Sequence, residues 1–185
     1  MGVNRSLKTL FVLNAVFVFA GNLLGPLYAI FAQSIDSKIL SVSYSWAALL
    51  LSTVVFMFIV GKFGDRIKEK EYLLAAGYAV RAIAWFGYIF VTNIYSLLVI
   101  QVISGLGQAL GTPAWDVIFA KHLDRNKEIM DYSDWSILSY LVMAISILVG
   151  GAVVTAFGFD MLFAIMGTLA LIAFVGLLMT PRRVL

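Results

Sequence analysis

The chain has 185 residues, of which 62% are hydrophobic and only 12% are charged. A soluble domain carries about twice that share of charged residues, so the composition excludes a soluble globular enzyme, a disordered chain and a nucleic-acid-binding domain. A membrane-spanning helix needs about 20 mostly apolar residues, and the apolar residues suffice for about five or six such helices. We therefore expect the net charge of +3 to reflect membrane topology rather than an anionic partner.

The remaining composition restricts the chemistry. There is no cysteine, and His122 is the only histidine. Disulfides, thiolate nucleophiles and cysteine metal sites are impossible, and little material remains for a transition-metal site or a Ser-His-Asp triad. We expect no enzyme activity, no cofactor and no metal site.

Six apolar stretches follow one another and predict six transmembrane helices. Backbone groups inside hydrocarbon must find hydrogen-bond partners within the protein, so each span is expected to be helical. The first stretch is too long for the apolar region of a signal peptide and contains Asn14, Asn22 and Pro26, so we interpret it as a retained helix. The predicted spans are residues 9–32, 42–61, 72–92, 95–119, 135–157 and 161–180.

Basic residues are concentrated on one side of these spans. The opposite side holds only Lys38, and Arg81 lies within a predicted span. The positive-inside rule then predicts cytoplasmic N- and C-termini, which agrees with an even number of spans. We expect the membrane to be a prokaryotic inner (plasma) membrane. The residues on the basic side are Arg5, Lys8, Lys62, Arg66, Lys68, Lys70, Lys121, Arg125, Lys127, Arg182 and Arg183.

Two segments resemble each other and indicate an internal repeat. GNLLGPLYAIF at 21–31 and GQALGTPAWDVIF at 107–119 share their glycines, an amide, a proline and an aromatic residue. KFGD at 62–65 and AFGFD at 156–160 form a weaker second pair. We predict one six-helix domain made of two units, about 1–93 and 94–185, related as a 3+3 inverted repeat. The alternative is ordinary small-residue helix packing. The predicted hinge and packing residues are Gly21, Gly25, Pro26, Gly107, Gly111 and Pro113.

Polar residues form a stripe on the fourth predicted span. At about 100° per residue, the stripe occupies a sector of roughly 80°. Facing lipid, its amides would lack partners, so the stripe must face protein or water. We predict a cavity for a small polar solute, for example a sugar; the alternative is hydrogen bonding between helices. The predicted cavity residues are Asn14, Asn22, Tyr28, Gln101, Ser104, Gln108, Thr112 and Trp115.

Two charged residues lie within predicted spans. Arg81 is about 13 Å along the third span, at about 1.5 Å per residue. Asp116 lies about one turn inside the fourth span. A charge at such depth is usually paired or functional, so an Arg81–Asp116 ion pair is one hypothesis. The alternatives are that Arg81 extends to the interface or meets a substrate anion. The coupling of transport to protons stays open.

The segment GKFGDRIKEK at 61–70 resembles the signature loop of the major facilitator superfamily. Gly61, Asp65 and Arg66 fit the pattern, whereas Lys68 replaces a usual glycine. Together with six spans and cytoplasmic termini, the resemblance extends over the whole chain. It implies alternating access, a twelve-helix fold of two six-helix halves, and a cytoplasmic gate at Gly61, Asp65 and Arg66.

This chain is long enough for only one such half. We therefore expect a half-size transporter that works as a parallel homodimer, joined through the second and fifth spans and surrounded by lipid. The alternatives are a hetero-dimeric partner, a fragment of a longer protein, and a non-transporting scaffold or accessory subunit.

Overall fold

The computed structural model describes residues 5–121, 123 and 126–180, with side chains from residue 11 onward. His122, Arg125, Arg182 and Arg183 lie outside the described residues. Within the described part the chain is helical and contains no strand. The elements are α1 (Arg5–Asn22), α2 (Leu27–Ile35), α3 (Ile39–Gly64), α4 (Lys70–Gly87), the 3-10 helix η1 (Tyr88–Phe90), α5 (Ile94–Lys121) and α6 (Glu128–Met179).

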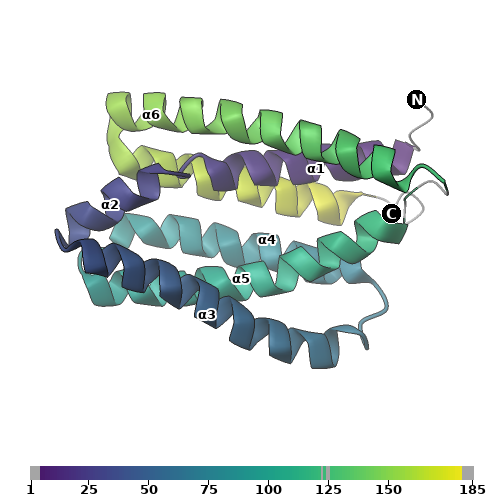
Figure 1. The fold of residues 1–185 in the computed structure, drawn as a ribbon, viewed down its shortest axis with the longest axis horizontal. Helices are drawn as coiled ribbons and strands as arrows, with labels where there is room; N and C mark the ends of the chain where they lie inside the picture. Colours follow the sequence, from purple (N-terminus) through teal and green to yellow (C-terminus); the bar gives the residue numbers. More distant parts are fainter. Residues whose placement is uncertain (1–4, 122, 124–125, 181–185) are drawn as a thin grey trace.

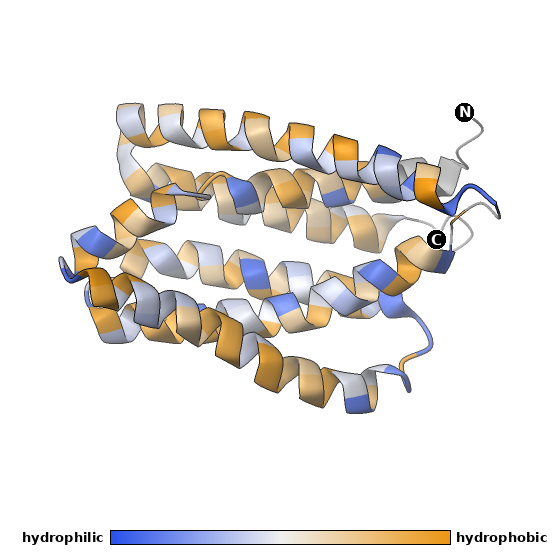
Figure 2. Cartoon of the chain, in the orientation of Figure 1, coloured by the Kyte–Doolittle hydropathy of each residue, from blue (hydrophilic) through white to orange (hydrophobic). Residues whose placement is uncertain are grey.

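The described helices have the length and composition of an integral membrane protein. Four helical segments are long and apolar enough to cross a membrane: α3, α4 with η1, α5 and α6. The pair α1 and α2 would form a fifth span. Figure 2 shows hydrophobic residues along most of each helix, with hydrophilic ones at the helix ends and at isolated turns inside the bundle.

The first predicted span, 9–32, is not one continuous helix, which corrects the sequence-based boundaries. The chain bends by 46° between α1 and α2. Gly25 has a φ of +30°, a left-handed conformation that favours glycine. Pro26, the residue before α2, has no backbone N–H to donate. The Gly-Pro pair therefore breaks the helix.

Helix α6 reverses direction. Its 52 residues would extend about 78 Å if straight, at about 1.5 Å per residue. That is more than twice the roughly 30 Å of a bilayer's hydrocarbon core. Gly158 has non-helical backbone angles (φ 82°, ψ 179°), and Figure 1 shows α6 doubling back on itself. We call residues 128–157 the first arm and residues 159–179 the second arm. The reversal falls between the predicted spans 135–157 and 161–180.

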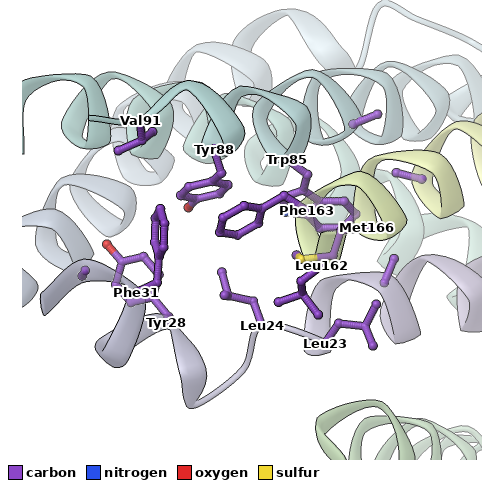
Figure 3. Packing of buried hydrophobic residues seen from close by; sticks show 14 of the residues in the cluster. Leu23, Leu24, Tyr28, Phe31, Trp85, Tyr88, Val91, Leu162, Phe163 and Met166 are labelled. Carbon is purple, nitrogen blue, oxygen red and sulfur yellow. The ribbon is translucent and has the colours of Figure 1, made fainter. Parts of the chain in front are cut away.

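The helices pack so that α4 and α5 lie at the centre. α5 contacts α3 and α4, whereas α6 contacts α1 and α4. A cluster of buried apolar residues joins α1, α2, α4, η1 and the second arm of α6 (Figure 3). Within it, the Phe163 ring stacks on Tyr88 at 4.9 Å and meets Phe31 edge-on at 4.8 Å. This cluster anchors the bent first span against the rest of the bundle.

Glycines permit the closest helix contacts. A Cβ on Gly77 of α4 would lie 2.7 Å from the Gly111 Cα and 2.9 Å from the Gly107 carbonyl oxygen of α5. A Cβ on Gly150 of the first arm would overlap the Leu23 carbonyl oxygen. Backbones approach this closely only where side chains are absent.

Gly150→Ala should therefore destabilise the bundle, whereas Gly151→Ala should not. The new methyl group at Gly150 would force α1 and the first arm apart, at a cost of about 1–3 kcal/mol. At Gly151 nothing lies within 4 Å of the new atom, so alanine should gain up to about 1 kcal/mol of helix propensity. Thermal unfolding in detergent, followed by tryptophan fluorescence, checks both variants. Equal unfolding temperatures would contradict the described contact.

Candidate functional site

Two adjoining cavities lie between the helices of the bundle. The larger, with a volume of about 480 Å³, lies between α1, α4, α5 and the first arm of α6. The smaller, about 150 Å³, lies beside the bend between α1 and α2 and also borders α3. Gly21, Asn22 and Arg81 line both cavities. These three residues therefore mark the junction.

All eight predicted cavity residues line one of the two cavities. Tyr28, Gln101 and Ser104 line the smaller one. Asn22 lines both. The predicted residues that line the larger cavity are Asn14, Asn22, Gln108, Thr112 and Trp115. The polar stripe of α5 is thus divided between two environments, and solute binding by these residues stays a prediction.

The smaller cavity contains a continuous chain of buried hydrogen bonds. The Tyr88 hydroxyl donates to Gln101 Oε1 at 3.1 Å, and Gln101 Nε2 donates to the Tyr28 hydroxyl. Tyr28 donates to Ser45 Oγ at 2.6 Å, which donates to the Val42 carbonyl at 2.9 Å. Gln101 and Tyr28 therefore bind each other, which favours helix packing over solute binding for these two residues.

The polar side chains of the larger cavity are less fully paired. Asn14 Oδ1 accepts a hydrogen bond from the Tyr78 hydroxyl at 2.6 Å, and Asn22 Nδ2 donates to the Val18 carbonyl at 2.8 Å. Gln108 and Thr112 form no hydrogen bond with any residue that the structure describes. Their amide and hydroxyl groups face a cavity large enough for an organic molecule. This cavity is the better candidate for a solute site.

Two tryptophans that line the larger cavity belong to a group of packed aromatic rings. Trp115 packs 4.8 Å from the Trp135 ring and 6.2 Å from the Phe11 ring, and Phe119 joins the same group. Trp135 and Tyr78 line the cavity but were not among the predicted cavity residues. Helical periodicity could not identify them, because their contribution depends on how α4 and the first arm face α5.

The predicted hinge residues have different roles in the two repeat segments. Gly25 and Pro26 break the first span, whereas Pro113 lies inside the continuous helix α5. The glycines Gly107 and Gly111 adjoin Gly77 of α4, as described above. A Cβ on Gly21 would lie 3.4 Å from the Trp85 ring and 3.8 Å from an Arg81 guanidinium nitrogen, both ordinary contact distances.

Arg81 enters the junction between the cavities. Its stem passes Gly107, where a Cβ would lie 2.7 Å from Arg81 Cγ. Its guanidinium lies 5.0 Å from the Trp85 ring centroid. Trp85 is one turn farther from Lys70, where α4 begins, so Arg81 does not extend toward that end of the helix. A charge inside a membrane costs at least about 2.5 kcal/mol by insertion scales, which makes this position functionally informative.

Arg81 and Asp116 line the same cavity but do not pair. Within the described residues, the ion pair that the structure contains joins Lys70 and Asp65. The Asp116 side chain is exposed. It lies nine residues beyond Gly107 along α5, about 13 Å at about 1.5 Å per residue. The hypothesised Arg81–Asp116 ion pair is therefore not present in this conformation.

The predicted gate residues lie at the end of α3. Lys70 Nζ donates to the Gly64 carbonyl at 2.8 Å and lies 3.8 Å from Asp65 Oδ1. The Asp65 side chain is 98% exposed, and Arg66 lies over the Phe63 ring. Gly61 borders a small pocket with Asp65. The loop is thus ordered by Lys70 and leaves Asp65 accessible to a partner.

Substitutions at the two glutamines of α5 should separate packing from cavity function. Gln101→Leu removes the partners of Tyr88 and Tyr28 in a buried network, which should cost about 1–3 kcal/mol of stability. Gln108→Leu should leave the unfolding temperature nearly unchanged, because Gln108 has no hydrogen bond within the described residues. Thermal unfolding of both purified variants is the measurement. A larger loss at Gln108 would contradict the assignment.

Comparison with known proteins agrees with this architecture. Residues 10–184 match the family described as Major Facilitator Superfamily. A comparison with curated proteins gave no match. The match covers nearly the whole chain, including both cavities and the loop at 61–70. The chain therefore belongs to the major facilitator superfamily.

Proposed function

We propose that this protein is a membrane transporter of a small polar organic solute, working by alternating access. The observation that carries the proposal is the larger cavity, whose polar side chains Gln108 and Thr112 lack partners in the described part of the chain. Members of this family are generally transporters. The bend at Gly25–Pro26 and the proline in α5 supply two points where cavity-lining helices could change angle.

We further propose six spans in a 3+3 inverted repeat, counting the bent pair α1–α2 as one span and each arm of α6 as one. Two matched contacts support it. Ser146 of the first arm donates to the Phe19 carbonyl at 2.7 Å, and Ser52 of α3 lies against Gly105 of α5. Gly105 follows Phe19 by the same 86 residues that separate Gly107 from Gly21.

The two serines are separated by the same interval as the second, weaker pair of repeated segments. Ser146 follows Ser52 by 94 residues, the same interval that separates Phe157 from Phe63 in the weaker repeat. The first span would thus contact the fifth as the fourth contacts the second. This correspondence of contacts supports the repeat, because coincidental glycine motifs alone do not predict it.

The orientation is proposed from charge. Figure 1 shows the start of α1, the segment between α3 and α4, the end of α5 and the start of α6 at one end of the bundle. Described basic residues gather there, whereas Lys38 lies in the connection at the opposite end. By the positive-inside rule the basic end is cytoplasmic.

A parallel homodimer is proposed as the working unit. α3 and the first arm of α6 expose long apolar faces: Leu51 of α3 is 67% exposed and Leu148 of the first arm is 75% exposed. The larger cavity is open on one side and lined by exposed Thr112 and Asp116. A second copy related by an axis along the membrane normal would close it.

Reconstituted transport tests the function. Purified protein in proteoliposomes should show saturable uptake of at least one small polar solute from a panel. Gln108→Leu and Thr112→Val should each lower the uptake rate roughly tenfold. Each variant removes a hydrogen-bond partner of the bound solute and leaves a polar group of the solute unpaired. A scaffold would show no saturable flux with any solute while both variants still fold.

Cysteine cross-linking tests the dimer, because the chain has no native cysteine. Paired cysteines at exposed positions of α3 and the first arm, such as Leu51 and Leu148, should give a covalent dimer in lipid bilayers. Cysteine at Ile83 of α4, 63% exposed, is the matched control and should not cross-link. Scanning both faces without a dimer band would exclude this interface.

A further inference from the structure

Arg81 is the one feature of the cavities that a neutral solute leaves unexplained. Arg81 Nε is buried and has no hydrogen-bond partner within the described residues. Within that part of the chain no carboxylate lies within ion-pair distance of its guanidinium. The guanidinium lies 5.0 Å from the Trp85 ring centroid, and the π face of this ring attracts the cation without neutralising it.

Glycines in both repeat segments make room for this side chain. Gly107 of α5 allows the Arg81 stem to pass, and Gly21 of α1 lies beside the guanidinium, where both residues line the two cavities. Any larger residue at Gly107 would displace the stem. The fold thus holds a cation at the junction of two cavities, where it lines both of them and is accessible to a solute.

Hydrogen-bond donors surround the same space. Because Asn14 Oδ1 accepts from Tyr78, the Asn14 amide presents its N–H groups as donors. Gln108 and Thr112 supply an amide and a hydroxyl from α5. Donors around a planar cation favour an oxyanion, which guanidinium binds with two parallel hydrogen bonds.

We propose that the larger cavity binds an organic monocarboxylate, with its carboxylate on Arg81 and its apolar body against the surrounding rings. The inference rests on the transport function proposed above and narrows its solute class. A monoanion is favoured because Arg81 is the one cation lining either cavity among the described residues. A neutral sugar, the expectation from sequence, would leave the Arg81 charge uncompensated.

The size and lining of the cavity specify the rest of the solute. Its volume of about 480 Å³ exceeds the needs of a carboxylate alone. Phe17, Tyr78, Trp115 and Trp135 contribute rings to its wall, which suits an apolar or aromatic body. Asp116 lies on the same wall toward the cytoplasmic end, where it would repel a second negative group.

Binding of matched probes tests the inference directly. Radiolabelled phenylacetate is measured on the full chain in nanodiscs of uncharged phosphatidylcholine, with unlabelled phenylacetate or phenylacetamide as competitor. The two competitors share one shape and differ in charge. Phenylacetate should compete at least about tenfold better, because the amide cannot neutralise Arg81.

Variants assign the preference to Arg81. Arg81→Gln should abolish the preference for phenylacetate over phenylacetamide. Arg81→Lys should keep part of this preference, because lysine supplies a point charge without the two parallel donors of guanidinium. Lys38→Gln, in the exposed connection, is the control and should leave the preference unchanged. Equal competition by both probes, absence of saturable phenylacetate binding, or a preserved preference in Arg81→Gln would overturn the proposal. If Arg81→Gln fails to fold, the probe comparison on the unmodified chain and Arg81→Lys still decide.

Stability without solute gives a second, probe-independent readout. Arg81→Met keeps the apolar stem beside Gly107 and removes the charge. Since no carboxylate among the described residues pairs with the charge, the unfolding temperature of the empty protein should rise or stay the same. A clear decrease would show that the protein itself compensates Arg81 and would overturn the proposal. Charge-selective binding without flux would instead refute the transport function alone, and flux of neutral solutes alone would refute this inference alone.

Discussion

Polar groups inside hydrocarbon must find partners within the protein, and the arrangement of this bundle follows from that requirement. The buried hydrogen-bond chain from Tyr88 through Gln101 and Tyr28 to Ser45 connects η1, α5, α2 and α3. Each side chain in it donates a hydrogen bond to the next one. Such a network holds the segment after the Gly25–Pro26 bend in register with its neighbours. Gln108, Thr112 and Arg81 Nε, which have no hydrogen-bond partner among the described residues, line the larger cavity instead.

Close approach of the helix backbones makes both the buried hydrogen-bond network and the cavity possible. Gly77, Gly107 and Gly111 bring α4 and α5 together, and Gly150 brings the first arm onto α1. These contacts replace a hydrophobic driving force, which is weak between helices in lipid. The same glycines leave room for the Arg81 side chain, so packing and the electrostatics of the cavity depend on one set of small residues.

The positions of the helices, the family and many of the cavity-lining residues could be predicted from the amino-acid sequence. The apolar stretches predict helices at nearly the observed positions, because hydrocarbon permits little else. The GKFGDRIKEK segment indicates the family, which the match over residues 10–184 confirms. The polar stripe on residues 101–115 predicts residues that line cavities, since unpaired amides cannot face lipid. It could not reveal that Gln101 and Tyr28 bind each other, because their contact joins residues 73 positions apart.

The sequence by itself indicated the helical membrane architecture and the polar interior, because these follow from local composition and periodicity, and its loop at 61–70 resembled that of the family. Only the tertiary structure decided which polar groups are satisfied. The direction of Arg81, past Gly107 and over Trp85 rather than toward Asp116, depends on how α1, α4 and α5 meet. A partner for a buried charge is a property of three-dimensional neighbours, and no spacing along one helix specifies it.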